Sequence, residues 1–118
     1  MFETIHWRIF IEASSKEKAE KVTKKLSQEI GELHVLKFER YWKDEKLFEI
    51  GCTTNLQLEN PERAVFQVLQ KANQLGREVL VRGPFLNEGK QVEFEGICSS
   101  PTFTGVKWFH FTIDNFRS

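Results

Sequence analysis

Three histidines and two cysteines are the side chains in this sequence best suited to acid–base or nucleophilic chemistry. They are His6, His34, His110, Cys52 and Cys98. An imidazole changes its charge near neutral pH, so each histidine is a candidate general acid or base. Neither cysteine has an evident histidine partner, and the sequence holds no Gly-rich phosphate loop and no Gly-x-Ser-x-Gly turn. The chain therefore offers single reactive groups and no catalytic constellation.

The spacing of these residues also gives no metal site. The sequence contains neither Cys-x-x-Cys nor His-Glu-x-x-His, the patterns by which zinc sites are recognised. We therefore expect no metal and no cofactor. Two isolated cysteines fit small buried thiols in a reducing compartment better than a disulfide, so we expect a cytoplasmic protein.

The composition argues against nucleic-acid and membrane partners. The 118 residues carry 17 basic and 17 acidic side chains, so the formal net charge is zero. A nucleic-acid-binding domain usually shows a basic excess or a basic stripe, and a membrane-spanning helix needs about 18 apolar residues in succession. The sequence has neither, and its first residues lack the regions of a signal peptide. Its length fits a single domain covering residues 1–118.

The longest regular pattern in the sequence runs from Phe48 to Leu58. Mostly apolar residues take the even positions, and polar or small residues lie between them. This period of two predicts a strand with one buried and one open face. Because the pattern is about twice as long as an average strand of 5–6 residues, we expect it to cross the middle of a sheet. The even positions are Phe48, Ile50, Cys52, Thr54, Leu56 and Leu58.

Two helices and five further strands are predicted around this strand. Ser14-Ser15 offers an N-cap for the first helix and Gly31 a C-cap. Asn60-Pro61 opens the second helix, Gly76 ends it, and Phe66 falls outside its apolar stripe. Strands are predicted over residues 5–12, 32–42, 78–82 (ended by Gly83-Pro84), 91–99 and 106–114.

This order of elements predicts an α+β fold. It matches a ferredoxin-like β-α-β-β-α-β arrangement with two additional C-terminal strands. Right-handed crossovers would place the first and third strands at the centre of an antiparallel-rich sheet, with both helices on one face. The sequence also repeats at an offset of 45 to 46 residues, since Phe48-Glu49 and Cys52 correspond to Phe94-Glu95 and Cys98. A helix, strand, turn, strand unit is therefore expected twice.

The open face of the predicted sheet is the first candidate site. His6, Arg8 and Phe10 are expected there beside Glu49. Glu49 could orient His6 for acid–base work, and ferredoxin-like sheets host small cofactor-free oxygenases, an analogy at the level of the fold. The RNA-recognition fold has the same topology, but here only Phe10 could stack on a base. A small-molecule-binding or oxygenase-like enzyme that uses His6 is therefore the alternative function.

The Tyr41-Trp42 pair is the second candidate site. It lies among the charged residues Arg40, Lys43 and Asp44, and aromatic side chains rimmed by mixed charge are typical of protein interfaces. We therefore predict a non-catalytic protein-interaction module, most specifically a small inhibitor or immunity-type protein that binds and occludes another protein.

The last predicted strand gives a further expectation about partners. Residues 106–113 carry apolar side chains on both faces, and we expect this strand at an edge of the sheet. An exposed apolar edge needs cover from a loop, a second copy or a partner strand. A homodimer formed through this strand is therefore expected as well.

Overall fold

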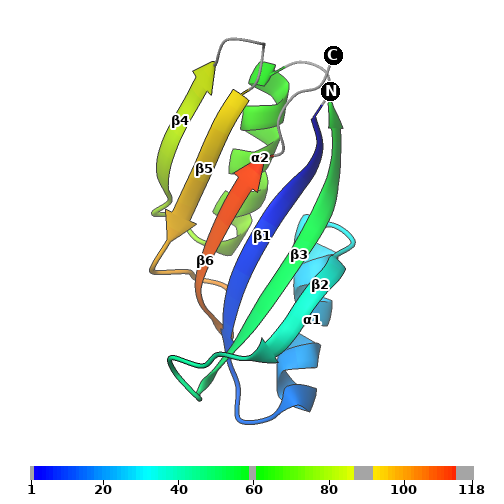
Figure 1. Ribbon diagram of the computed structural model, residues 1–118, viewed down its shortest axis with the longest axis vertical. Helices are drawn as coiled ribbons and strands as arrows, with labels where there is room; N and C mark the ends of the chain where they lie inside the picture. Colours follow the sequence, from blue (N-terminus) through cyan, green and yellow to red (C-terminus); the bar gives the residue numbers. More distant parts are fainter. Residues whose placement is uncertain (1, 59–60, 87–91, 114–118) are drawn as a thin grey trace.

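The computed structural model describes residues 2–58, 61–86 and 92–113, which form two helices and one sheet of six strands (Figure 1). All neighbouring strands are antiparallel, in the order β2-β3-β1-β6-β5-β4. This confirms the predicted α+β class. The strands are β1 (Phe2–Glu12), β2 (His34–Arg40), β3 (Leu47–Leu58), β4 (Leu80–Leu86), β5 (Val92–Cys98) and β6 (Val106–Ile113), and the helices are α1 (Lys16–Ile30) and α2 (Pro61–Leu75).

The order of the last three strands differs from the prediction. In a β-α-β-β-α-β arrangement the strand after the second helix lies beside the first strand. Here that strand, β4, forms the far edge of the sheet, and the chain returns through β5 to β6, which pairs with β1. The expected edge position of residues 106–113 is therefore wrong, because β6 has β1 on one side and β5 on the other. It offers no free edge to a second copy, and the edges of the described sheet are β2 and β4.

Strand β4 also runs further than predicted. Gly83-Pro84 does not end it, and the strand continues to Leu86 with an irregular register between Arg82 and Phe85. A proline lacks a backbone N–H, which an edge strand can accommodate on its unpaired side. Gly83 has a φ of 97°, a conformation that favours glycine.

The predicted caps of α1 are confirmed. The Ser15 side chain accepts a hydrogen bond from the backbone N–H of Lys18 at 3.3 Å, and Gly31 follows the helix with a φ of 104°. The last turn of α1 holds no basic residue, but Lys71 of α2 donates a hydrogen bond to the carbonyl of Ile30. This places a cation at the negative end of the α1 dipole. The predicted N-cap of α2, Asn60, lies outside the described residues.

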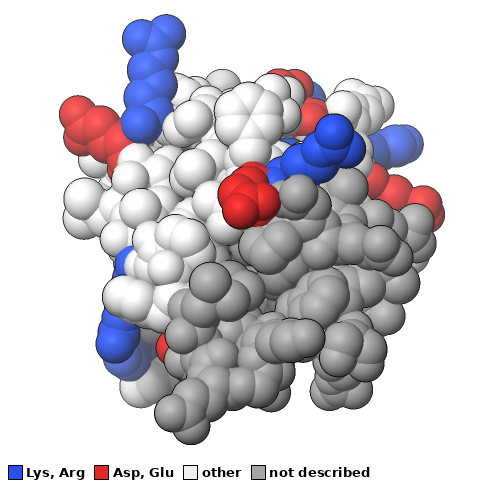
Figure 2. Space-filling view, turned by 90° about the horizontal axis from the view of Figure 1, so that it is seen from above, with Lys and Arg blue, Asp and Glu red and all other residues white. Residues whose placement is uncertain are grey.

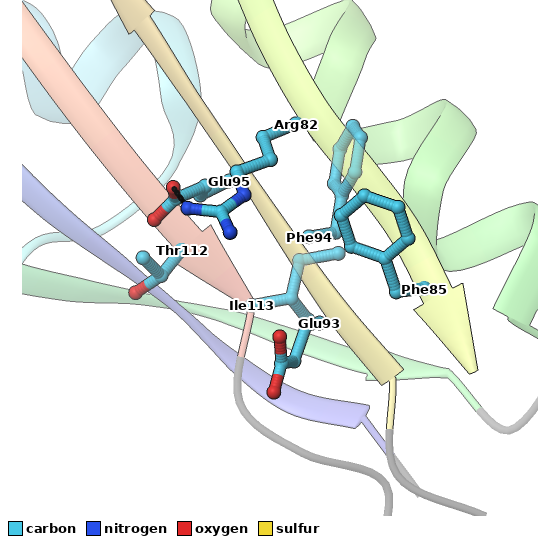
Figure 3. Close-up of a pocket in the computed structure, with 7 residues that line it drawn as sticks. All are labelled: Arg82, Phe85, Glu93, Phe94, Glu95, Thr112 and Ile113. Atoms are coloured by element: carbon cyan, nitrogen blue, oxygen red, sulfur yellow. Dashed lines mark ion pairs between the residues drawn. The ribbon is translucent and has the colours of Figure 1, made fainter. Parts of the chain in front are cut away.

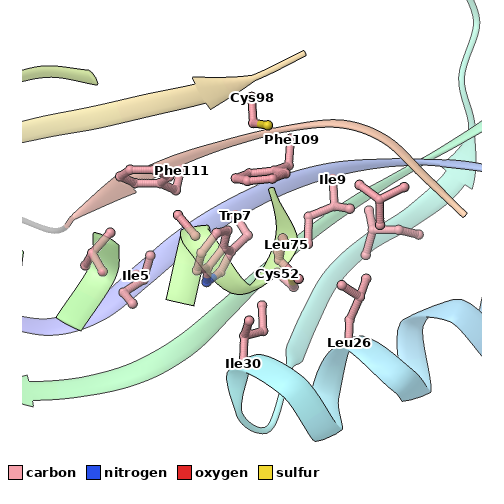
Figure 4. Packing of buried hydrophobic residues seen from close by; sticks show 14 of the residues in the cluster. Ile5, Trp7, Ile9, Leu26, Ile30, Cys52, Leu75, Cys98, Phe109 and Phe111 are labelled. Carbon is pink, nitrogen blue, oxygen red and sulfur yellow. The ribbon is translucent and has the colours of Figure 1, made fainter. Parts of the chain in front are cut away.

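Both helices and the sheet contribute side chains to one buried cluster (Figure 4). The predicted parity of β3 is confirmed, since Phe48, Ile50, Cys52 and Leu56 are at most 6 % exposed; the side chain of Leu58 lies outside the described part. In α2, Phe66 is off the buried stripe as predicted and is 62 % exposed. Within the described residues, neither helix is long and apolar enough to cross a membrane.

Trp7 of β1 lies at the centre of this cluster. Its ring centroid is 6.0 Å from that of Phe109 and 5.7 Å from that of Phe111, both on β6. Its indole N–H donates a hydrogen bond to the hydroxyl of Thr54 at 2.9 Å. A buried indole needs an acceptor, which explains why a threonine occupies one of the apolar positions of β3.

The assignment of faces can be tested with two aspartate substitutions in β3. Ile50 is fully buried, so Ile50→Asp should lower the free energy of unfolding by about 3–5 kcal/mol by placing an unpaired charge in the core. Thr53→Asp lies on the other face and should cost about 1 kcal/mol or less. Thermal melts of the two variants measure the difference, and equal destabilisation would contradict the assignment.

The cysteines provide a second test. Cys52 and Cys98 are both free and buried, and burial raises the pKa of the Cys52 thiol to about 12. Because the thiolate is the reactive form, the native protein at neutral pH should react with a thiol reagent far more slowly than the protein unfolded in urea. Rapid labelling of either cysteine in the native state would show that its surroundings are open.

Candidate functional site on the open face of the sheet

The open face is the side of the sheet whose side chains alternate with those of the buried cluster. Charged groups from all six strands follow one another across it, and we call them the charge row. Ion pairs link most neighbouring members, and Arg8 and His110 lie opposite each other in the register of β1 with β6. In strand order the members are Lys37 and Glu39 (β2), Glu49 (β3), Arg8 (β1), His110 (β6), Glu95 (β5) and Arg82 (β4).

Glu49 is the most buried member of the charge row. Only 4 % of the residue is exposed. Arg8 Nε donates to its Oε2 at 2.6 Å, and Lys37 Nζ lies 3.2 Å from its Oε1. Burial acts to raise the pKa of the Glu49 carboxyl, but the hydrogen bonds from Arg8 and Lys37 outweigh it and hold the pKa below its usual value. An ionised carboxylate between two cations is suited to fixing the strands and not to donating a proton.

Lys37 reaches Glu49 because β2 is irregular. The register of β2 with β3 shifts between Val35 and Lys37, which places Lys37 opposite Gly51 on the open face. A bulge of this kind turns the following side chains to the other side of the strand. Leu36, at the bulge, is 74 % exposed.

Glu95 repeats the arrangement of Glu49 in the other half of the sheet. Its Oε2 lies 3.5 Å from His110 Nε2, and its Oε1 lies 3.9 Å from an Arg82 guanidinium nitrogen. Each glutamate is thus flanked by a basic group from its hairpin partner strand and one from a central strand. The preceding helices, α1 and α2, have 15 residues each, in keeping with the repeated unit predicted from the sequence.

Phe10 belongs to the open face but is completely buried. Trp108 of β6 stacks on it with ring centroids 3.9 Å apart and an interplanar angle of 12°. Tyr41 meets it edge-on at 4.7 Å, and the Arg8 guanidinium lies 5.0 Å from its centroid. We call Phe10, Tyr41, Trp42 and Trp108 the aromatic cluster. It makes one continuous surface of the two sites that the sequence indicated separately.

Trp42 is the exposed end of the aromatic cluster. It is 79 % exposed, and its ring lies edge-on to Tyr41 at 6.2 Å. Lys43 Nζ is 5.0 Å from the centroid of the Trp42 ring, within cation–π range. The ring is therefore held from one side and open to solvent on the other.

The turn that carries Trp42 is fixed by hydrogen bonds. The backbone N–H of Tyr41 donates to the carbonyl of Leu47 at 2.8 Å, and the N–H of Leu47 donates to the carbonyl of Asp44 at 3.0 Å. The Asp44 carboxylate accepts from the N–H of Lys46 at 3.0 Å. Asp44, predicted as a contact residue, thus also has a local role in shaping the turn.

Arg40 is exposed and contacts the turn and the edge of the buried cluster. Its guanidinium donates to the carbonyl of Glu45 and lies 4.5 Å from the centroid of the Phe48 ring. Arg40 therefore helps to hold the turn against the edge of the buried cluster.

His6 is not brought to Glu49. In the register of β1 with β3, His6 lies opposite Thr53, whereas Glu49 lies opposite Phe10. Four residues along a strand separate these positions by about 13 Å. The open-face pocket of about 220 Å³ includes Thr112, the neighbour of His6 on β6, but not His6 itself. Among the described residues, no group of three or more His, Cys, Asp and Glu is placed to hold a metal ion.

The described surface carries both basic and acidic side chains. Phe10, the one aromatic considered for base stacking, lies beneath Trp108. Figure 2 shows one end of the molecule, where described basic and acidic side chains are scattered among uncharged ones. The charge row likewise mixes both signs.

Trp108, Lys37, Glu95 and Arg82 are members of this surface that sequence reasoning missed. Trp108 could be found only by pairing β6 with β1, and Lys37 only by knowing the irregularity of β2. Glu95 could have been predicted from the sequence, because it corresponds to Glu49 in the internal repeat.

A Glu49→Gln substitution tests the role of the buried carboxylate. The pKa of Glu49 is lowered in the folded protein, so its stabilising contribution is complete above about pH 4.5, the usual value, and is lost as the pH falls through the lower folded value. The variant should be less stable at pH 7 by about 1–2 kcal/mol, since its partners are half exposed. The difference in the free energy of unfolding between wild type and Glu49→Gln should become smaller below pH 4.5.

Glu39→Gln is the matched control for this measurement, because it removes the same charge from an exposed member of the charge row. It should change the stability by about 0.5 kcal/mol or less. Urea unfolding of the three proteins from pH 7 to pH 3 supplies the curves, and a constant gap between wild type and Glu49→Gln would refute the role assigned to the carboxylate.

The contacts of the open face are the basis for a proposal about function. Comparison of the sequence with models of known protein families, with curated proteins and with solved structures gives no match.

Proposed function

We propose that this chain is a non-catalytic protein-interaction module whose contact surface is centred on Trp42. The observation that carries the proposal is a large aromatic side chain that is 79 % exposed on a turn fixed by hydrogen bonds. In its most specific form, the module is a small inhibitor or immunity-type protein that occludes another protein.

The surroundings of Trp42 fit an interface core with a polar rim. Tyr41 and the buried Phe10 support the aromatic surface from below. Lys43, Asp44, Glu45 and Lys46 surround it with both signs of charge. Tryptophan and tyrosine are enriched among the residues that dominate binding energy. Because the turn is already ordered by its own hydrogen bonds, little conformational entropy is lost when it is bound.

The alternative is an enzyme that uses His6 on the open face, and it has less support. Such an enzyme needs a second group to orient the imidazole. Glu49 is about 13 Å from His6 along the strands and its oxygens are bound by Arg8 and Lys37. Phe10 is covered by Trp108 and Tyr41 instead of lining a cleft.

We further infer that the fold is a variant of the ferredoxin-like arrangement with both helices on one face of the sheet. The order β2-β3-β1 supports this, as does the single buried cluster to which both helices contribute. In this variant, β4 and β5 come before the strand that pairs with β1. A cytoplasmic location is supported by the two free, buried thiols.

Site-specific crosslinking tests the proposed surface. A photoreactive phenylalanine analogue at position 42 should crosslink to a defined protein in extract from the source cells, and the same analogue at position 66 should not. Phe66 is a matched control, since it is also an exposed aromatic, 62 % exposed on α2. Equal crosslinking from both positions would argue against a specific surface at Trp42.

Affinity measurements with the crosslinked partner then test Trp42 itself. Trp42→Ala should weaken binding at least tenfold, or about 1.4 kcal/mol, with little change in melting temperature. Phe66→Ala should leave the affinity unchanged. Tyr41→Ala removes the edge contact with buried Phe10 and should lower the melting temperature. Unchanged affinity of Trp42→Ala would remove Trp42 from the interface.

A further inference from the structure

We propose that a pocket between β4, β5 and β6 on the open face binds an aromatic ring that carries a hydrogen-bond donor. We infer that the ring is a tyrosine or tryptophan side chain of the protein partner. The source of the ring rests on the proposed function. The existence of the site rests on the geometry of the pocket and on the matching registers of the two halves of the sheet.

In Figure 1, the end of β4, the start of β5 and the end of β6 lie toward the top, and the turn between β2 and β3 lies at the bottom. Side chains near the first of these ends line the pocket (Figure 3). Its volume is about 220 Å³. An apolar cavity of about 150 Å³ holds benzene, so the pocket has room for one aromatic ring with a substituent. It is lined by Arg82, Phe85, Glu93, Phe94, Glu95, Thr112 and Ile113.

The other half of the sheet shows what fills the corresponding place. Glu49 lies opposite Phe10 of the central strand β1, and Glu95 lies opposite Thr112 of the central strand β6. Phe10 fills the first position with a ring, which Tyr41 and Trp108 enclose. Thr112 has no ring, so the second position is left as a pocket. The matching registers of the two halves therefore indicate an aromatic group as the missing occupant.

The polar groups of the pocket restrict the kind of ring. Arg82 is paired with Glu95 at 3.9 Å and lies at one side of the pocket (Figure 3). In the other half, Arg8 of the central strand lies 5.0 Å from the centroid of Phe10. Arg82 comes from the hairpin partner strand, as Lys37 does in that half, and its guanidinium can contact a bound ring from this side. The Glu95 carboxylate lies near His110 and Arg82, and a carboxylate has about four acceptor positions, so it can also accept from a phenol O–H or an indole N–H. Phe85, 49 % exposed, supplies an apolar wall.

A second copy of this chain fits the pocket less well than a different protein. The charge row is nearly symmetrical about the Arg8–His110 pair, with basic, acidic and basic groups on each side. Two open faces related by a two-fold axis along or across this row would bring like charges together. Like charges brought together in an interface disfavour binding, so the occupant is a partner of another kind.

The experiment uses p-cresol, the side-chain analogue of tyrosine, and the full chain labelled with ¹⁵N. Titration should shift the backbone amide signals of Arg82, Glu95 and Thr112, with a dissociation constant on the order of 1 mM. The signals of Phe10 and Trp42 should stay in place. 4-Methylcyclohexanol, which has the same size without the π-system, should bind at least threefold more weakly.

Thr112→Phe places a phenylalanine in the pocket, at the position that corresponds to Phe10 in the other half of the sheet. It should occupy the pocket and weaken p-cresol binding at least tenfold. Thr53→Phe makes the same change elsewhere on the open face and should leave binding unchanged. If Thr112→Phe does not fold, Phe85→Ala serves instead, because loss of the apolar wall should also weaken binding severalfold.

Several results would overturn the inference. If p-cresol at about 10 mM, tenfold above the expected dissociation constant, shifts no amide signal of the wild-type protein, no ring binds in the pocket. Shifts confined to Trp42 place the ring elsewhere. A dimer that Thr112→Phe converts to a monomer identifies a second copy as the occupant. Crosslinking from position 42 does not depend on the pocket, so failure here and failure of the proposed function can be told apart.

Discussion

The pairing of β1 with β6 holds the two halves of this protein together. On the buried side, Trp7 packs against Phe109 and Phe111. On the open side, Phe10 stacks on Trp108. Because β1 begins the described chain and β6 ends it, this contact closes a loop of almost the whole sequence. Contacts of such long range are slow to form, and the six-stranded sheet is complete only when this one has been made.

Each half of the sheet uses the same helix, strand, turn, strand unit for a different purpose. In the half made of β2, β3 and β1, rings fill the open side around Glu49 and continue outward to the exposed Trp42. In the half made of β4, β5 and β6, Thr112 leaves room beside Glu95. The same charged framework thus supports a projecting aromatic side chain at one end and a pocket at the other.

Local features of the sequence predicted much of this structure. The period of β3 showed which side chains are buried, and Ser15 and Gly31 marked the ends of α1. These signals depend on neighbouring residues only. The partner of β1 depends on the path of the chain after α2, and no local pattern distinguishes a return to β1 from a hairpin at the far edge.

The candidate site was predictable in part for the same reason. Glu49 and Arg8 were placed on one face by strand parity, and the structure joins them. His6 was placed on that face too, but the register separates it from Glu49, and register is not encoded in parity. Trp108 was overlooked because its contact with Phe10 becomes evident only when β6 is paired with β1.

The mixed charges of the open face bear on how quickly a partner is found. Basic and acidic groups are mixed across the six strands, and the chain as a whole has no net charge. Their fields cancel within roughly 10 Å, about one screening length at 0.1 M salt. The proposed partner would therefore not be attracted from a distance. Its association rate would depend on random collision, at about 10⁵–10⁶ M⁻¹s⁻¹ with little response to salt. Tight binding on such a surface must come from slow dissociation.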